Sequence, residues 1–141
     1  GILAKVAEMT IFLNPLESSY QRFGNNKAPR YISWSSENRS QLVRVPAAVG
    51  EYKRAELRSP DPAANTYLAF ALMIYASLYG IQNKLELQDP ADINLYKADA
   101  DTLAKFEQLP ENLKSACSLA NNSDFIKEHI PGAILEIYCN K

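Results

Sequence analysis

The stretch KRAELRSPDPAANTYLAFALMIYASLYGIQNK, residues 53–84, joins a charged, strand-like segment directly to a long apolar run. Residues 53–58 alternate in a way that predicts a short strand. Pro60 and Pro62 end this strand, because proline offers no N–H to a sheet ladder. A strand that stops at a proline pair and is followed by a helix decides that the fold mixes both kinds of element.

The apolar run predicts a helix that reaches about Tyr79. Asp61 is expected as its N-cap, Pro62 at its first helical position and Gly80 as its C-cap. The uncharged stretch 67–81 is shorter than the roughly 20 residues that a membrane span needs. We therefore expect a helix of a globular protein, with nearly all of its own sides buried.

The rest of the chain supplies further short elements. The patterns predict a helix over 2–13, strands over 31–35 and 42–46, and small helices near 101–108, 111–120 and 123–138. A polar stretch over 82–101 is expected on the surface. The order of elements predicts the α+β class, with short antiparallel strands packed with the long buried helix and small C-terminal helices.

Composition limits the classes of protein that this chain can belong to. With 141 residues it is long enough for one domain with a moderate core. A net charge of −1 argues against a general nucleic-acid binder. We therefore expect neither a nucleic acid nor a membrane as a partner, although a local basic pocket is compatible with this charge.

The chain contains two cysteines and one histidine, residue types that commonly bind metals. Cys117 and Cys139 lack the close spacing of zinc ligands and are expected to be free, reduced thiols in a cytoplasmic protein. His129 has no cysteine or histidine near it and stands before Ile130 and Pro131. A residue at the end of a helix is the favoured interpretation of His129.

A stripe of charges follows the predicted strand. Arg54, Glu56 and Arg58 are two residues apart, so they share one face of a strand. Arg44 occupies the predicted neighbouring strand, and Arg39 lies just before it. If the strands pair, up to four arginines and one carboxylate gather at one place.

Spacing alone leaves two interpretations of this stripe open. Surface strands often carry opposite charges that stabilise each other across the sheet, and such exposed ion pairs contribute little. Alternatively, the arginines form a pocket for a polyanion, since guanidinium groups bind phosphates and carboxylates in bidentate fashion. In that case the lone glutamate would orient an arginine or bind a cation such as Mg²⁺.

Several separate blocks of the sequence closely resemble one enzyme family. The blocks are GILAK, NPLESSYQRF, YISWSSENRSQLVRVP and AELRSPDPAANTYLAFALMIYASLYGIQNK. In this order they resemble the C-terminal part of the catalytic domain of type I glutamine synthetases, over residues 1–96 and more loosely over the tail. The resemblance implies an ATP-dependent ligase that joins ammonia to glutamate through a γ-glutamyl phosphate, with Mg²⁺ or Mn²⁺.

The resemblance implies that three arginines bind the nucleotide and its phosphates. Arg39, in ENRS, matches an arginine that contacts the transferred phosphate and the nucleotide. Arg44, in VRVP, matches a second arginine on the phosphate side, and Arg54 matches one that contacts ATP. Cations placed around the phosphoryl oxygens offset the charge that these oxygens gain during transfer.

The resemblance also implies residues for the amino acid and the metal. Arg22, in SYQRF, matches the arginine that holds the glutamate substrate. Glu56 matches a carboxylate ligand of the metal that coordinates the ATP phosphates. Arg58 matches an arginine near the glutamate carboxylate and the phosphoryl group. Arg58 and Arg39 are therefore the expected catalytic residues.

One loop departs from the family pattern. The family carries a glutamate just before the sequence AP, thought to take a proton from ammonium, whereas this chain has Lys27 in the loop GNNKAP. A charged lysine repels ammonium and cannot act as the base. Lys27 therefore keeps two alternatives open: a γ-glutamyl-amine ligase that uses another amine, such as a polyamine or an anilide, and a degenerate, non-catalytic relative.

The resemblance further implies that residues 1–141 are a single, incomplete C-terminal fragment of the domain. The remaining metal ligands would lie upstream, and a neighbouring subunit of a ring-shaped homo-oligomer would complete the active site. We therefore expect the isolated chain to be inactive. Tyr96, in INLY, matches a tyrosine that is adenylylated in one subgroup, and a plain surface tyrosine is the favoured interpretation.

Overall fold

The computed structural model describes residues 1–25 and 27–140. The helices are α1 (Ile2–Leu13), α2 (Glu17–Tyr20), α3 (Thr66–Gln82), α4 (Ala100–Leu103), α5 (Leu113–Asn122), α6 (Asp124–His129) and α7 (Gly132–Cys139). The strands are β1 (Trp34–Ser35), β2 (Val43–Arg44) and β3 (Glu56–Leu57), with a 3₁₀ turn over Gly50–Tyr52. The predicted α+β class is confirmed. His129 ends α6, as predicted.

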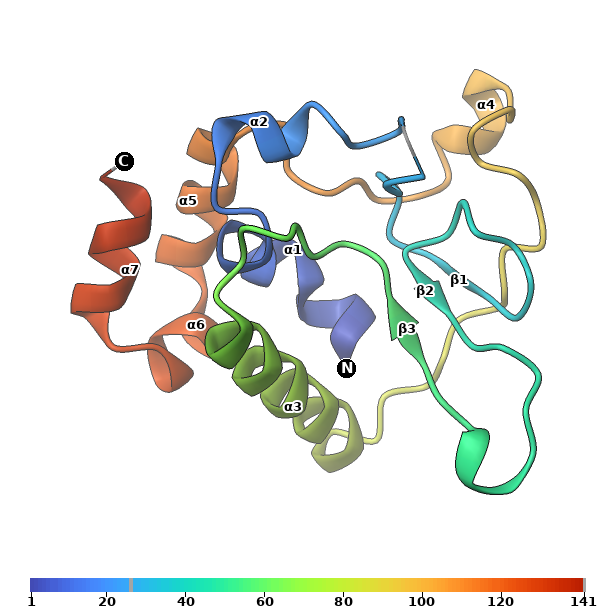
Figure 1. The fold of residues 1–141 in the computed structure, drawn as a ribbon, viewed down its shortest axis with the longest axis horizontal. Coiled ribbons are helices and arrows are strands. Elements are labelled where there is room, and N and C mark those ends of the chain that lie inside the picture. Colours follow the sequence, from blue (N-terminus) through green and yellow to red (C-terminus); the bar gives the residue numbers. More distant parts are fainter. Residues whose placement is uncertain (26, 141) are drawn as a thin grey trace.

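Helix α1 forms the centre of the core. It packs against α3, α5 and α6, and Figure 1 shows it between the C-terminal helices and the small sheet. The predicted bounds 2–13 are confirmed. Val6 and all five residues from Met9 to Leu13 are fully buried, so the second half of α1 is buried on every side.

The sheet differs in two ways from the expected one. Each strand is only two residues long, much shorter than predicted, and the strand order is β1-β2-β3. Strands β2 and β3 pair antiparallel, but β1 and β2 run parallel. Strand β2 runs parallel to β1 because the loop between them carries the chain back before β2 begins. The side chains of Ser35 and Asn38 bind backbone N–H groups of this loop and hold its shape.

Helix α3 begins later than predicted. Asp61 is not its N-cap; the Asn65 side chain accepts the N–H groups of Tyr67 and Leu68 instead. Asp61 uses one carboxylate oxygen to cap a turn at the N–H of Ala63 and turns the other towards Arg22. A tertiary ion pair therefore replaces the local capping role that the sequence pattern favours.

Helix α3 also ends later than predicted. Gly80 lies inside it, and the positive φ expected at the end of the helix falls on Lys84, at 49°. The Asn83 side chain binds the carbonyl oxygen of Tyr79 and closes the last turn. A side chain at Gly80 would place its Cβ 2.6 Å from the nitrogen of Gly1, so the glycine permits α1 and α3 to approach closely.

The prediction that α3 is buried on nearly all sides is wrong for this chain. Only Ala69, Leu72 and Ala76 are buried. The large side chains on the opposite side are exposed, among them Tyr67, Phe70, Ile74, Leu78 and Ile81. An apolar run without charges therefore marks a helix with one buried face and one uncovered face. No helix among the described residues is long and apolar enough to cross a membrane.

The C-terminal helices form a separate layer on the far side of α1. The single helix predicted over 123–138 is two helices, because Pro131 has no N–H to continue α6 and fixes the backbone at the junction.

Cys117 of α5 and Cys139 of α7 form a disulfide. The prediction of two free thiols is therefore wrong: the expected compartment favours reduced cysteines, but the packing of α5 against α7 brings the two together.

Candidate functional site

The paired strands β2 and β3 place an arginine and a glutamate opposite each other. Arg44 of β2 stands across from Glu56 of β3. The Nε and Nη2 atoms of Arg44 donate to Oε2 of Glu56 at 3.0 and 2.7 Å. Hydrogen bonds between two charged groups at this distance are among the stronger ones in proteins. The predicted stripe therefore contains a well-formed ion pair.

Arg58 joins this pair from the end of β3. Its Nε lies 3.3 Å from Oε1 of Glu56, so each glutamate oxygen faces a different guanidinium group. Its Nη2 donates to the carbonyl oxygen of Lys27 at 3.1 Å, and its Nη1 to the carbonyl oxygen of Arg39. With an 11% exposed side chain, Arg58 ties two loops to the strand. We call Arg44, Glu56 and Arg58 the arginine–glutamate cluster.

The charges of the cluster determine the ionisation of Glu56. The hydrogen bond from Arg44 and the positive charges of Arg44, Arg58 and Arg39 hold the pKa of Glu56 below its usual value, while partial burial opposes them. Arg39 thus acts on the cluster through its charge and its carbonyl oxygen. Arg44 and Arg58 are largely buried, so a fully solvated ladder of ion pairs does not describe this site.

The lowered pKa predicts how the cluster responds to acid. A carboxylate whose pKa is depressed on folding stabilises the protein above its unfolded pKa, and this contribution is lost as the pH falls through the folded value. We expect the difference in free energy of unfolding between the wild type and Glu56→Gln to be constant at neutral pH. It should shrink below about pH 4.5, the ordinary value. Urea unfolding of both proteins at a series of pH values measures this difference in free energy. A difference that grows in acid would contradict the lowered pKa of Glu56.

Besides Arg39, two more of the predicted arginines lie outside the cluster. Arg54 precedes β3, and its Nη1 donates locally to the carbonyl oxygen of Tyr52. Arg22, after α2, lies 3.2 Å from Oδ2 of Asp61 through Nε, and its Nη2 donates to Oδ1 of Asn14 at 2.9 Å. The Nε contact is an ionic one, because it is too poorly aligned for a hydrogen bond. The roles of both arginines stay predictions.

Lys27 and Tyr96 lie close to Arg58. Lys27 has a φ of 65°, a left-handed conformation that is uncommon for lysine, and Arg58 binds its carbonyl oxygen. Its neighbour Asn26, in the predicted loop, lies outside the described residues. Burial raises the pKa of Tyr96, and the positive charge of Arg58 partly offsets this rise. Modification of Tyr96 stays a prediction.

Comparison with known proteins decides the family. The model of the glutamine synthetase catalytic domain matches residues 1–141. The chain belongs to the glutamine synthetase catalytic-domain family. It is 42% identical to the glutamine synthetase of Methanosarcina mazei, over 98% of this chain and 32% of that protein. It is 37% identical to that of Staphylococcus aureus, over 99% of this chain and 32% of that protein.

A solved structure supports the same fold. The structure of GmaS in complex with ADP superposes with a TM-score of 0.83 at 28% identity, covering 99% of this chain and 32% of the other. The chain thus spans about a third of the length of the glutamine synthetases that it matches. The resemblance seen in the sequence blocks is confirmed.

The described residues of this family member do not form a metal site by themselves. They contain no group of three or more histidine, cysteine, aspartate or glutamate side chains placed to hold a metal ion. Glu56 is the one carboxylate of the cluster, and both of its oxygens face arginines. Mg²⁺ or Mn²⁺ binding at Glu56 therefore stays a prediction.

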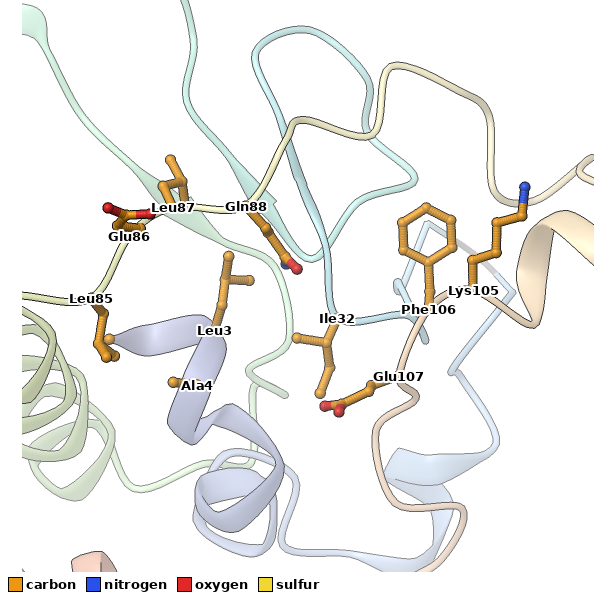
Figure 2. Close-up of a pocket in the computed structure, with 11 residues that line it drawn as sticks. Leu3, Ala4, Ile32, Leu85, Glu86, Leu87, Gln88, Lys105, Phe106 and Glu107 are labelled. Atoms are coloured by element: carbon orange, nitrogen blue, oxygen red, sulfur yellow. The ribbon is translucent and has the colours of Figure 1, made fainter.

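A cavity elsewhere in this glutamine synthetase family chain contains none of the predicted site residues. It has a volume of about 510 Å³ and lies between the first turn of α1 and the segments 85–88 and 105–107. Figure 2 shows Leu3, Ile32, Leu87 and Phe106 among the side chains around it, with Glu86, Lys105 and Glu107. The arginine–glutamate cluster, not this cavity, is therefore the candidate functional site.

Proposed function

We propose that the full-length protein that contains this chain is an ATP-dependent ligase that joins ammonia to glutamate. The observation that carries this proposal is the arginine–glutamate cluster in a chain of the glutamine synthetase family. Sequence identities of about 40% to two glutamine synthetases favour the same chemistry. The charges of Arg39, Arg44 and Arg58 around one carboxylate suit a substrate that carries several phosphates.

The proposed reaction has two steps. An oxygen of the glutamate γ-carboxylate attacks the γ-phosphorus of ATP, the bond to ADP breaks, and a γ-glutamyl phosphate forms. Ammonia then attacks the acyl carbon, the C–O bond breaks, phosphate leaves with the former carboxylate oxygen, and the amine nitrogen loses a proton. Both steps place negative charge on phosphoryl oxygens, which fixed positive charges stabilise.

We assign each predicted residue a part in this reaction. Arg39, Arg44 and Arg54 bind the nucleotide and its phosphates. Arg22 binds the glutamate. Arg58 already directs three of its N–H groups at the protein. We therefore propose that it acts through its charge and by holding the segments of Lys27 and Arg39 in place.

The whole ligase needs more than this chain provides. We propose that Glu56 shares a Mg²⁺ or Mn²⁺ ion with ligands from the upstream half of the catalytic domain. We also propose that a neighbouring subunit of a ring-shaped homo-oligomer completes the site in the cytoplasm. The isolated 141 residues are then inactive. The relatives are about three times as long, and the described residues offer no complete metal site.

Lys27 supports a second candidate function, a γ-glutamyl-amine ligase that uses another amine. A cation in the loop disfavours ammonium as the substrate. The similarity to the structure of GmaS is compatible with this alternative. A degenerate relative without catalysis is the third interpretation of Lys27, and it predicts no turnover with any amine.

An amine panel separates these functions. We expect ATP-dependent phosphate release by the full-length protein with glutamate and ammonium, and we expect Lys27→Glu to raise kcat/KM for ammonium at least about tenfold, since general bases typically contribute 10²–10⁴. Lys114→Glu, an exposed substitution on α5, is the matched control and should change little. Release only with another amine would select the second function, and release with none, in a folded protein, the third.

A further inference from the structure

The guanidinium group of Arg22 is held from two sides. Its Nη2 donates to Oδ1 of Asn14, a fully buried residue that follows the last residue of α1. Its Nε faces Oδ2 of Asp61 at 3.2 Å, and the Asp61 side chain is only 12% exposed. The hydrogen bond at Nη2 and the ionic contact at Nε lie along one edge of the guanidinium group and together orient it.

The groups that hold Arg22 are themselves fixed. Asn14 donates through Nδ2 to Oγ of the buried Ser59 at 3.0 Å, and the N–H of Asp61 donates to the carbonyl oxygen of Leu13 at 2.8 Å. Pro60 and Pro62 flank Asp61 and restrict its backbone. The segment SPDP is therefore clamped to the end of α1, which gives Asp61 a rigid support.

The two oxygens of Asp61 have different partners. Oδ1 accepts the N–H of Ala63 at 2.7 Å and closes the turn before α3. Oδ2 faces Arg22. The polar contacts of Arg22 with the protein involve Nε and Nη2. Within the described residues, Nη1 therefore remains for a ligand, on a side chain that is 32% exposed.

We propose that Asp61, supported by Asn14, is a positioning residue that holds Arg22 with Nη1 directed at a carboxylate of the glutamate substrate. This inference rests on the proposed ligase function. A pre-oriented guanidinium binds a planar carboxylate at a lower entropic cost than a free one. The prolines around Asp61 thus serve the site as well as ending the strand.

Asp61→Asn in the full-length protein is the sharpest test. The amide oxygen can keep the bond to Ala63, which turns the NH₂ group towards Nε of Arg22, donor against donor. We expect the Kd for L-glutamate, measured by isothermal titration, to rise about tenfold. A misdirected Nη1 would lose its hydrogen bond to the substrate carboxylate, and a hydrogen bond to a charged group contributes about this factor. The Kd for ATP should stay within about twofold. Asp61→Glu, which retains the charge, should recover part of the glutamate affinity.

Controls separate positioning from general destabilisation. Glu8→Gln breaks another partly buried ion pair, with Lys5, that shares no contact with Arg22, and it should leave both affinities unchanged. If Asp61→Asn fails to fold, Asp61→Ser keeps an acceptor for Ala63 and should show the same loss for glutamate. Unchanged glutamate binding in the folded variant would overturn this inference alone. A wild-type protein that binds no glutamate would overturn the proposed function as well.

Discussion

Arg58→Gln is expected to lower kcat/KM for ATP-dependent phosphate release by about 10³, because removal of one preorganised charge-stabilising group typically costs 10²–10³. The substitution removes a positive charge from the proposed phosphoryl site. It also releases Glu56 and the carbonyl oxygens of Lys27 and Arg39. Glutamine is too short and too weak a donor to replace three such contacts.

A matched variant shows whether this loss is specific. Arg30→Gln removes an arginine whose Nη2 donates to the carbonyl oxygen of Phe23, outside the cluster, and it should reduce kcat/KM by no more than about twofold. Melting temperature and oligomeric state of both variants are measured beside the kinetics. Equal losses in the two variants, or a fully active Arg58→Gln, would contradict the role of the cluster.

The disulfide is expected to give the second large effect, on stability. Cys117 and Cys139 are separated by 22 positions, and closing a loop of that size lowers the free energy of the folded state by about 3 kcal/mol relative to the unfolded chain. The double substitution Cys117→Ser and Cys139→Ser should therefore lower the free energy of unfolding of the 141-residue chain by about this amount. The loss should be largest in α7, which the bond joins to α5.

Reductant provides the control for the disulfide. Dithiothreitol should destabilise the wild-type chain as much as the double substitution does, and it should leave the double variant unchanged. Titration of accessible thiols under denaturing, non-reducing conditions should find none in the wild type. Two titratable thiols and a melting temperature that ignores reductant would contradict the disulfide and favour free cysteines.

Sequence patterns predict those parts of the fold that depend on the spacing of apolar residues along one segment. The helical spacing of apolar residues over 2–13 gives α1 its correct bounds, and these residues are the ones that α1 packs against three other helices. The predicted start of α3 is wrong because aspartate is a favoured N-cap residue, yet the Asp61 side chain contacts Arg22 instead. The parallel pairing of β1 with β2 depends on side-chain bonds within one loop, which periodicity does not reveal.

The candidate site divides in the same way. Alternation along the strands predicts that Arg54, Glu56 and Arg58 share a face and that Arg44 joins them if the strands pair. The structure brings Arg44, Glu56 and Arg58 together and leaves Arg54 apart. The supports of Arg22 come from two segments, Asn14 after α1 and Ser59 with Asp61 some 45 positions later, and no local spacing rule links these two segments. The contacts of Arg58 with two backbone carbonyl oxygens are equally hidden from sequence patterns, since every residue has such a group.

The central claim is that the full-length protein forms a γ-glutamyl phosphate, and oxygen transfer tests it most directly. Glutamate labelled with ¹⁸O in its γ-carboxylate is incubated with the protein, ATP and ammonium, or with the amine that the panel selects. The released phosphate is then analysed by mass spectrometry. Phosphate that carries one ¹⁸O atom from glutamate is the predicted result. Unlabelled phosphate, or a folded protein that releases none, would contradict the proposed ligase.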